Sequence, residues 1–205
     1  MVLGLPANSR RVLLACAKCL TPLAVTLACG LGLSLSTASA AGHGCDRATT
    51  AANRLPLATV RAAVRCLINE ERTVHGLPPL RGSSRLSDSA QQWVNTLVSA
   101  DLFSHGNFAD RLHAVGVNFF FAGENLGTGQ RSPSQIVRAW MASADHCRNI
   151  LDPVFSQVGI GVNLRSVPGY SSGPATWAAD FDLPIGHRSP SKNAGPAKGC
   201  PYSSL

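Results

Sequence analysis

Two histidines and one glutamate, each in a short polar motif, are the residues of this chain best suited to chemistry. His105 closes a Phe-Ser-His motif, Glu124 lies in Gly-Glu-Asn-Leu, and His146 lies in Asp-His-Cys-Arg-Asn. Two imidazoles and a carboxylate can hold a divalent ion such as Zn²⁺, or they can position a water molecule. If the fold brings them together, His105, Glu124 and His146 form one polar cluster, with all three as candidate metal ligands.

Each of these residues also has a structural explanation. His105 could be a loop histidine that bonds to the backbone, and His146 could cap a short helix. A buried glutamate is costly unless it is paired, so Glu124 could serve a salt bridge or a hydrogen bond to histidine. The metal-ligand and structural interpretations of Glu124 both stay open.

Two apparent nucleophile motifs are better explained by structure. Cys147 follows His146, but neighbouring helix residues point in different directions and an exported cysteine is usually oxidised. Residues 169 to 173, Gly-Tyr-Ser-Ser-Gly, match the G-x-S-x-G pattern, which requires a strand before it and a helix after it. Strand-like runs flank it on both sides here, so we expect a hairpin loop.

Helices are predicted where apolar residues recur at spacings of three and four. Such stripes run from Val60 to Ile68, ended by Gly76, and from Ala90 to Val98, with Ser87 as the expected N-cap. A short helix is expected over residues 110 to 115, and another begins at Ser-Pro-Ser-Gln, residues 132 to 135. The indoles of Trp93 and Trp140 lie on the apolar faces and are interpreted as core.

Strands are predicted near the end of the chain. Residues 158 to 162 and 175 to 181 are β-like and are separated by a Pro/Gly/Ser turn, which indicates a hairpin. Residues 118 to 121 could add a further strand. Helices followed by a closing hairpin predict an α+β domain, in which helices cover a small antiparallel sheet.

The first forty residues are typical of an export signal. Basic residues precede an apolar run from Leu20 to Leu35, and Ala-Ser-Ala at 38 to 40 offers a cleavage site. A membrane anchor and lipidation at Cys29 are the alternatives. We divide the remaining chain into an irregular tail at 41–55, one domain at 56–184 and a second irregular tail at 185–205, without a transmembrane span.

Charge and cysteine usage also favour export. The whole chain has a formal charge of +7, and removing the three basic residues of the signal leaves 15 − 11 = +4, with no basic run that indicates nucleic acid. Four cysteines then remain, which allows two disulfides in three pairings. We hypothesise that Cys45 pairs with Cys66 and Cys147 with Cys200, because each bond would attach one tail to a helix.

The ordered motifs resemble bacterial members of the CAP superfamily, which comprises the cysteine-rich secretory proteins, antigen 5 and the plant pathogenesis-related proteins. The resemblance runs from about residue 62 to 183 and implies an α-β-α sandwich with a central cleft. It places His105, Glu124 and His146 in that cleft. Many eukaryotic members have a glutamate where this chain has Ser143, and a hydroxyl cannot replace a carboxylate as a base or a hard-metal ligand.

Two functions of different class follow from these expectations. The first is a secreted or wall-associated binding module, monomeric, for a lipid, cell-wall or protein ligand, whose cleft holds a divalent ion. The alternative is a metal-dependent hydrolase in which His105, Glu124 and His146 hold a Zn²⁺-activated water. We favour the binding module, because Ser143 removes the second acid.

Overall fold

The computed structural model describes residues 45–189 and 199–201. The predicted signal at 1–40 and its Cys29 lie outside these residues. The described elements, in chain order, are the 3-10 helix η1 (Ala52–Arg54), α1 (Leu57–Val74), β1 (Arg81–Gly82), α2 (Ser84–Ser99), α3 (Phe108–Ala114), β2 (Phe119–Thr128), α4 (Pro133–Met141), α5 (Ala144–Leu151), β3 (Gln157–Asn163) and β4 (Thr176–Pro184).

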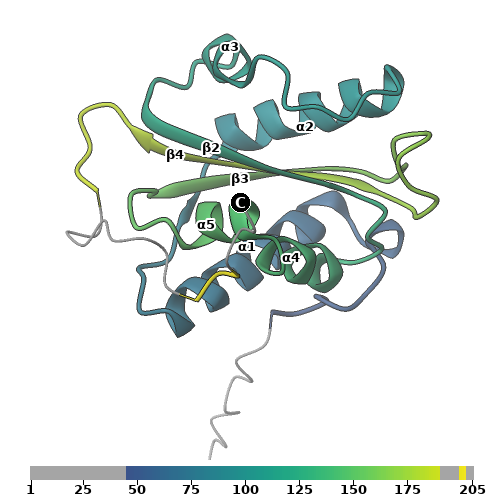
Figure 1. Ribbon diagram of the computed structural model, residues 1–205, viewed down its shortest axis with the longest axis horizontal. Coiled ribbons are helices and arrows are strands. Elements are labelled where there is room, and N and C mark those ends of the chain that lie inside the picture. Colours follow the sequence, from purple (N-terminus) through teal and green to yellow (C-terminus); the bar gives the residue numbers. More distant parts are fainter. Residues whose placement is uncertain (1–44, 190–198, 202–205) are drawn as a thin grey trace, which may run out of the picture. The chain divides into compact units, whose positions relative to one another are not determined.

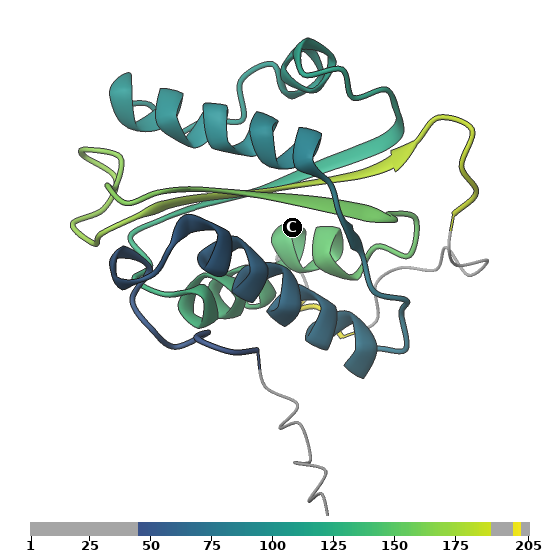
Figure 2. The same cartoon turned by 180° about the vertical axis from the view of Figure 1, so that it is seen from behind.

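Helices cover both faces of a four-stranded sheet whose order is β1-β3-β4-β2. Figure 1 shows α2 and α3 on one face and α1, α4 and α5 on the other, and Figure 2 shows the same layers from behind. The predicted α-β-α sandwich and the β3–β4 hairpin are confirmed. The sheet is mixed rather than wholly antiparallel, because β1, which sequence patterns did not indicate, pairs parallel with β3.

The helical stripes predicted from the sequence face the core. Val60, Val64 and Ile68 of α1 are buried against the sheet, and the helix ends just before Gly76. The predicted N-cap of α2 was wrong. Ser83, not Ser87, caps it by accepting the backbone N–H of Leu86, because the helix begins one turn earlier than its apolar stripe.

Strand β2 extends well beyond the predicted residues 118 to 121. It continues through Glu124 and Asn125 to Thr128 and pairs antiparallel with β4 along its length. These polar residues interrupt the alternation that marks a strand, yet both are buried. Because β2 is an edge strand, groups from both helical layers can reach it.

Both hypothesised disulfides are present. Cys45 is bonded to Cys66 in α1, and Cys147 in α5 is bonded to Cys200. The sequence separations are 21 and 53 residues. In the chain-entropy account, loops of this size stabilise the fold by roughly 3 and 4 kcal/mol.

A buried arginine joins α1 to the end of α5. Arg72 is fully buried and donates hydrogen bonds to the carbonyl oxygens of Pro78, Ile150 and Asp152. Burial lowers the pKa of Arg72 to about 10, although the Asp152 carboxylate opposes this shift. The guanidinium thus satisfies carbonyls at the C-terminal end of the helix that carries His146.

Candidate functional site

Glu124 is the centre of the candidate site. It lies in the middle of β2, and its side chain is only 2% exposed. One carboxylate oxygen accepts a hydrogen bond from His105 Nδ1 at 2.7 Å, and the other accepts one from Arg111 at 2.6 Å. Both oxygens are therefore engaged by cationic or polar partners, as the structural interpretation of this residue requires.

His105 lies in the loop between α2 and α3, with 57% of its side chain exposed. A carboxylate only accepts hydrogen bonds, so the hydrogen-bonded Nδ1 carries the proton and Nε2 is left for another ligand. The hydrogen bond to Glu124 raises the pKa of His105, with a smaller opposing effect from burial. A carboxylate behind an imidazole is the usual arrangement for orienting a metal-binding histidine.

The loop that holds His105 is fixed by Trp93 of α2. Its indole N–H donates to the carbonyl of Ser104 at 3.0 Å. Gly106 has a φ of +55°, and a side chain there would collide with the indole ring. Trp140 is fully buried, as the interpretation of both indoles as core requires, whereas Trp93 is half-buried and packs against the edge of a core cluster.

Arg111 of α3 is a site residue that the sequence did not indicate. Its guanidinium carbon lies 4.2 Å from the ring centre of Trp93 and 5.1 Å from that of Phe108. It also donates to the backbone carbonyl of His105 at 3.1 Å. Arg111 therefore neutralises Glu124 and holds the His105 loop at the same time.

A second buried acid lies beside Glu124. Asp180 of β4 is the direct cross-strand neighbour of Glu124 and is fully buried. Burial raises the pKa of Asp180 well above its usual value, and the negative charge of Glu124 raises it further. The raised pKa favours the neutral form of Asp180, which lowers the repulsion between two carboxyl groups that adjoin inside the sheet.

His146 approaches β2 from the opposite helical layer. It lies in the first turn of α5, where Asn125 of β2 donates to its backbone carbonyl at 2.9 Å. The side-chain amide of Asn149 in α5 donates to the backbone carbonyl of Glu124 and to the side-chain oxygen Oδ1 of Asn125, so α5 is fastened to this part of β2. Burial lowers the pKa of His146, and the positive charge of His105 lowers it further, which favours the neutral ligand form.

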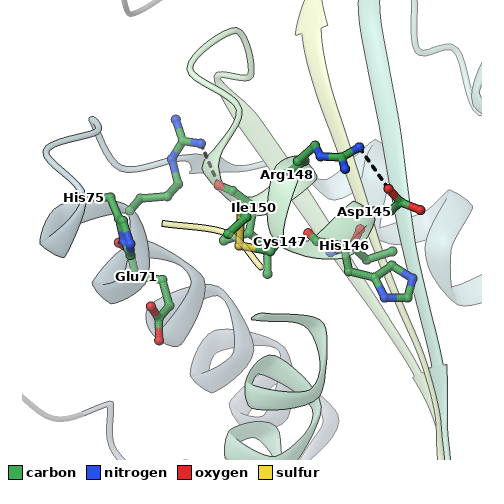
Figure 3. The surroundings of a disulfide bond; sticks show 10 residues. Glu71, His75, Asp145, His146, Cys147, Arg148 and Ile150 are labelled. Atoms are coloured by element: carbon green, nitrogen blue, oxygen red, sulfur yellow. Dashed lines mark hydrogen bonds and ion pairs between the residues drawn. A yellow bond between two sulfur atoms is a disulfide. The ribbon is translucent and has the colours of Figure 1, made fainter. Parts of the chain in front are cut away.

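Ser143 and Cys147 complete the surroundings of His146. Ser143 is the N-cap residue of α5, but its side chain accepts no capping hydrogen bond. Figure 3 shows the imidazole of His146 directed away from the disulfide, while Cys147 points toward it. Cys147 therefore has no free thiol with which to form a Cys–His pair, as expected.

The predicted three-ligand metal set stays a prediction. Among residues 45–189 and 199–201, the His, Cys, Asp or Glu donor atoms that cluster within 4.8 Å as a set of three belong to Cys45, Cys66 and Glu70. Disulfide sulfur atoms cannot act as thiolate ligands, so that group does not form an ion site. His105 and Glu124 are in contact, and His146 lies farther away across β2.

The G-x-S-x-G match has the structural role expected of it. Residues 169 to 173 lie in the loop between β3 and β4, where Ser171 Oγ accepts the backbone N–H of Gly173. No helix follows this serine before β4 begins at Thr176 in this part of the described chain. The loop therefore lacks the strand-to-helix turn that exposes a nucleophilic serine.

Comparisons with known proteins agree with this architecture. The model of the cysteine-rich secretory protein family matches residues 66–179. The chain is 37% identical over 100 residues to the uncharacterized protein YkwD of Bacillus subtilis, covering 46% of this chain and 39% of YkwD. It is 28% identical over 104 residues to the uncharacterized membrane protein YlbC of the same organism, covering 48% of this chain and 30% of YlbC.

Two solved structures show the same fold. An extracellular protein with an SCP domain from Bacillus anthracis superposes with a TM-score of 0.54 at 24% identity, over 62% of this chain and 44% of its own. A cysteine-rich secretory protein from Staphylococcus aureus gives 0.53 at 19% identity, over 62% of this chain and 40% of its own. The chain thus spans less than half the length of these relatives.

No helix within 45–189 or 199–201 is both long enough and apolar enough to cross a bilayer. The motifs, the α-β-α sandwich, the two disulfides and a family model that matches more than half of the chain all agree. This chain belongs to the cysteine-rich secretory protein family, CAP.

Proposed function

We propose that this chain is an exported binding module for a lipid, cell-wall or protein ligand. In this proposal His105 and His146 hold a divalent ion through their imidazoles, and Glu124 orients His105 from behind. The two disulfides and the extracellular setting of the Bacillus anthracis neighbour support export.

One observation carries the proposal: both oxygens of the Glu124 carboxylate are already bonded, at 2.7 Å to His105 and at 2.6 Å to Arg111. A carboxylate held in this way, and 2% exposed, cannot approach a substrate as a general base without breaking a buried ion pair. Ser143 supplies no second acid. The cluster is therefore better suited to holding an ion than to activating water.

The donor set fits such an ion in chemistry, while the two imidazoles supply fewer ligands than the three or four protein groups that usually hold Zn²⁺. Neutral imidazole suits Zn²⁺ and similar metals, and the carboxylate behind His105 is a second-shell partner of the usual kind. A bound ion would supply positive charge at the mouth of the cleft. His105 and His146 would hold it, while Arg111 keeps Glu124 in the orientation that presents His105.

The test uses the mature chain, residues 41–205, with His105→Ala and His146→Ala as variants. His187→Ala is a matched control, since His187 is exposed and its imidazole bonds to the backbone carbonyl of Ile185. Zn²⁺ binding is measured by calorimetry, and retention is measured on purified cell-wall material and lipid vesicles. We expect both cleft variants to lose Zn²⁺ and to keep the retention seen for the control.

Hydrolysis is measured in the same samples with peptide, ester and glycan substrates. We expect none above the rate of the variants. Hydrolysis that disappears with a chelator and in both cleft variants would overturn the binding-module proposal and establish the metal-dependent hydrolase instead.

A further inference from the structure

A basic groove lies at the edge of the sheet opposite to the histidine cleft. The sheet order places β2 and its Glu124 at one edge and β1 beside β3 at the other. At the second edge, Arg61 and Arg65 of α1, Gly82 of β1, Ser87 of α2 and Ile160 of β3 line a cavity of about 230 Å³. This volume has room for several water molecules, each of which takes about 30 Å³.

Within the described part of the chain, the two arginines of this groove have no negatively charged partner. Arg61 and Arg65 are one helical turn apart on α1, where like charges repel. Ion pairs among the described residues involve neither of them. Arg61 donates to the neutral amide oxygen of Gln91 at 2.9 Å, and its shielded Nε has no hydrogen-bond partner in the described part of the chain.

Arg65 is placed across the groove by a glycine. Its guanidinium occupies the position that a side chain of residue 82 would take, so only Gly82 allows it to lie there. Arg65 is exposed, and its charge is available to a ligand. Two guanidinium groups therefore line one small cavity, and neither of them pairs with a carboxylate among the described residues.

Two backbone features add to the positive potential. Arg81 and Ser83 donate their N–H groups to β3, so the N–H of Gly82 between them points away from the sheet. The groove also adjoins the first two turns of α1, whose first turn contains no acidic residue. A helix N-terminus of this kind carries partial positive charge.

We propose that this groove binds a phosphoryl group of an anionic ligand. Two guanidinium forks and a backbone N–H match the several acceptor oxygens of a phosphate ester, whereas a single carboxylate would satisfy only one fork. The ligand could be a lipid headgroup or a soluble or polymeric phosphate ester, which present the same chemistry. The groove acts independently of an ion at the histidine cleft.

The test uses mature chain at low ionic strength, titrated with inorganic phosphate and with glycerol phosphate. Binding is followed by calorimetry and by the amide NMR signals of Gly82 and Ser87. Arg65→Gln is the main variant, since Arg65 is exposed and the core does not depend on it. Arg165→Gln in the β3–β4 loop is the charge-matched control, and Arg61→Lys keeps charge while removing a fork.

We expect Arg65→Gln to weaken phosphate binding about tenfold or more, and Arg61→Lys to weaken it by a smaller factor. Arg165→Gln should leave the affinity within about twofold, because Arg165 does not line the groove. Equal affinity in wild type and Arg65→Gln, or phosphate titration without a shift at Gly82, would overturn the proposal.

Vesicles distinguish the two sources of phosphate. Sedimentation with phosphatidylglycerol vesicles but not phosphatidylcholine vesicles, lost in Arg65→Gln, supports a lipid headgroup. Glycerol phosphate binding that depends on Arg65, without vesicle binding, supports a soluble or polymeric ester. A third outcome would refute a built site. In it, Arg65→Gln and Arg165→Gln weaken vesicle binding equally and neither small phosphate binds, which would show only diffuse charge attraction.

Discussion

Replacing Arg111 by methionine isolates the charge that neutralises Glu124. Methionine keeps an apolar side chain between the rings of Trp93 and Phe108, so packing changes little. The carboxylate of Glu124 is then buried with His105 as its remaining ionic partner. Stranding one member of a buried ion pair costs roughly 3–5 kcal/mol, and because Arg111 is 15% exposed we expect about 3 kcal/mol.

When Glu124 is also replaced by glutamine, Arg111→Met leaves no buried carboxylate without its arginine partner. There we expect Arg111→Met to cost about 1 kcal/mol, mainly from the lost hydrogen bond to the His105 carbonyl. Urea unfolding of the four proteins at pH 7.5, with disulfides intact, measures the coupling, which should be about 2 kcal/mol. A coupling below about 0.5 kcal/mol would refute the view that Arg111 serves to neutralise Glu124.

Three further changes test other parts of the structure. Arg72→Met should lower the free energy of unfolding by about 3–5 kcal/mol, measured by thermal unfolding, because it leaves buried carbonyls without donors. A loss below about 1 kcal/mol would contradict this role. Burial raises the pKa of Asp182 to about 6, so the stability that its protonated form contributes is present below pH 4 and is lost as pH rises through 6. The unfolding free energy of Asp182→Asn should therefore exceed that of wild type by about 1 kcal/mol at pH 7.5 and equal it at pH 4. A constant difference across that pH range would contradict the shift. Ser143→Glu should tighten Zn²⁺ binding about tenfold by restoring an acid, measured by calorimetry, and unchanged affinity would show that Ser143 does not face the ion.

Periodicity predicted those elements whose one face is continuously apolar. The stripe of α1 and the closing β3–β4 hairpin belong to this group, because burial on one side repeats at a fixed interval. Strand β2 was predicted too short since Glu124 and Asn125 are polar but buried, and their partners come from α3 and α5. Such pairing depends on tertiary contacts that a local pattern cannot reveal.

The candidate site was predicted through its histidines and Glu124, but the residues that set its electrostatics were not. Arg111 resembles any helix-surface arginine in sequence, and it becomes a site residue only because α3 packs beside Trp93. Asp180 lies in a run of strand-forming residues, where an acid in an otherwise apolar stretch was the one available signal. The raised pKa of Asp180 follows from burial beside Glu124, and that neighbourhood depends on the strand register.

The most direct test of the account is the imidazole nitrogen spectrum of the mature, ¹⁵N-labelled chain during Zn²⁺ titration at pH 7.5. The whole chain has six histidines, so each imidazole can be assigned by substitution. We predict that a nitrogen of His146 and Nε2 of His105 shift on binding, while Nδ1 of His105 stays protonated and bonded to Glu124. Zn²⁺ binding that leaves these two imidazoles unchanged, or that removes the Nδ1 proton of His105, would contradict the claim that they hold the ion with Glu124 as the orienting group.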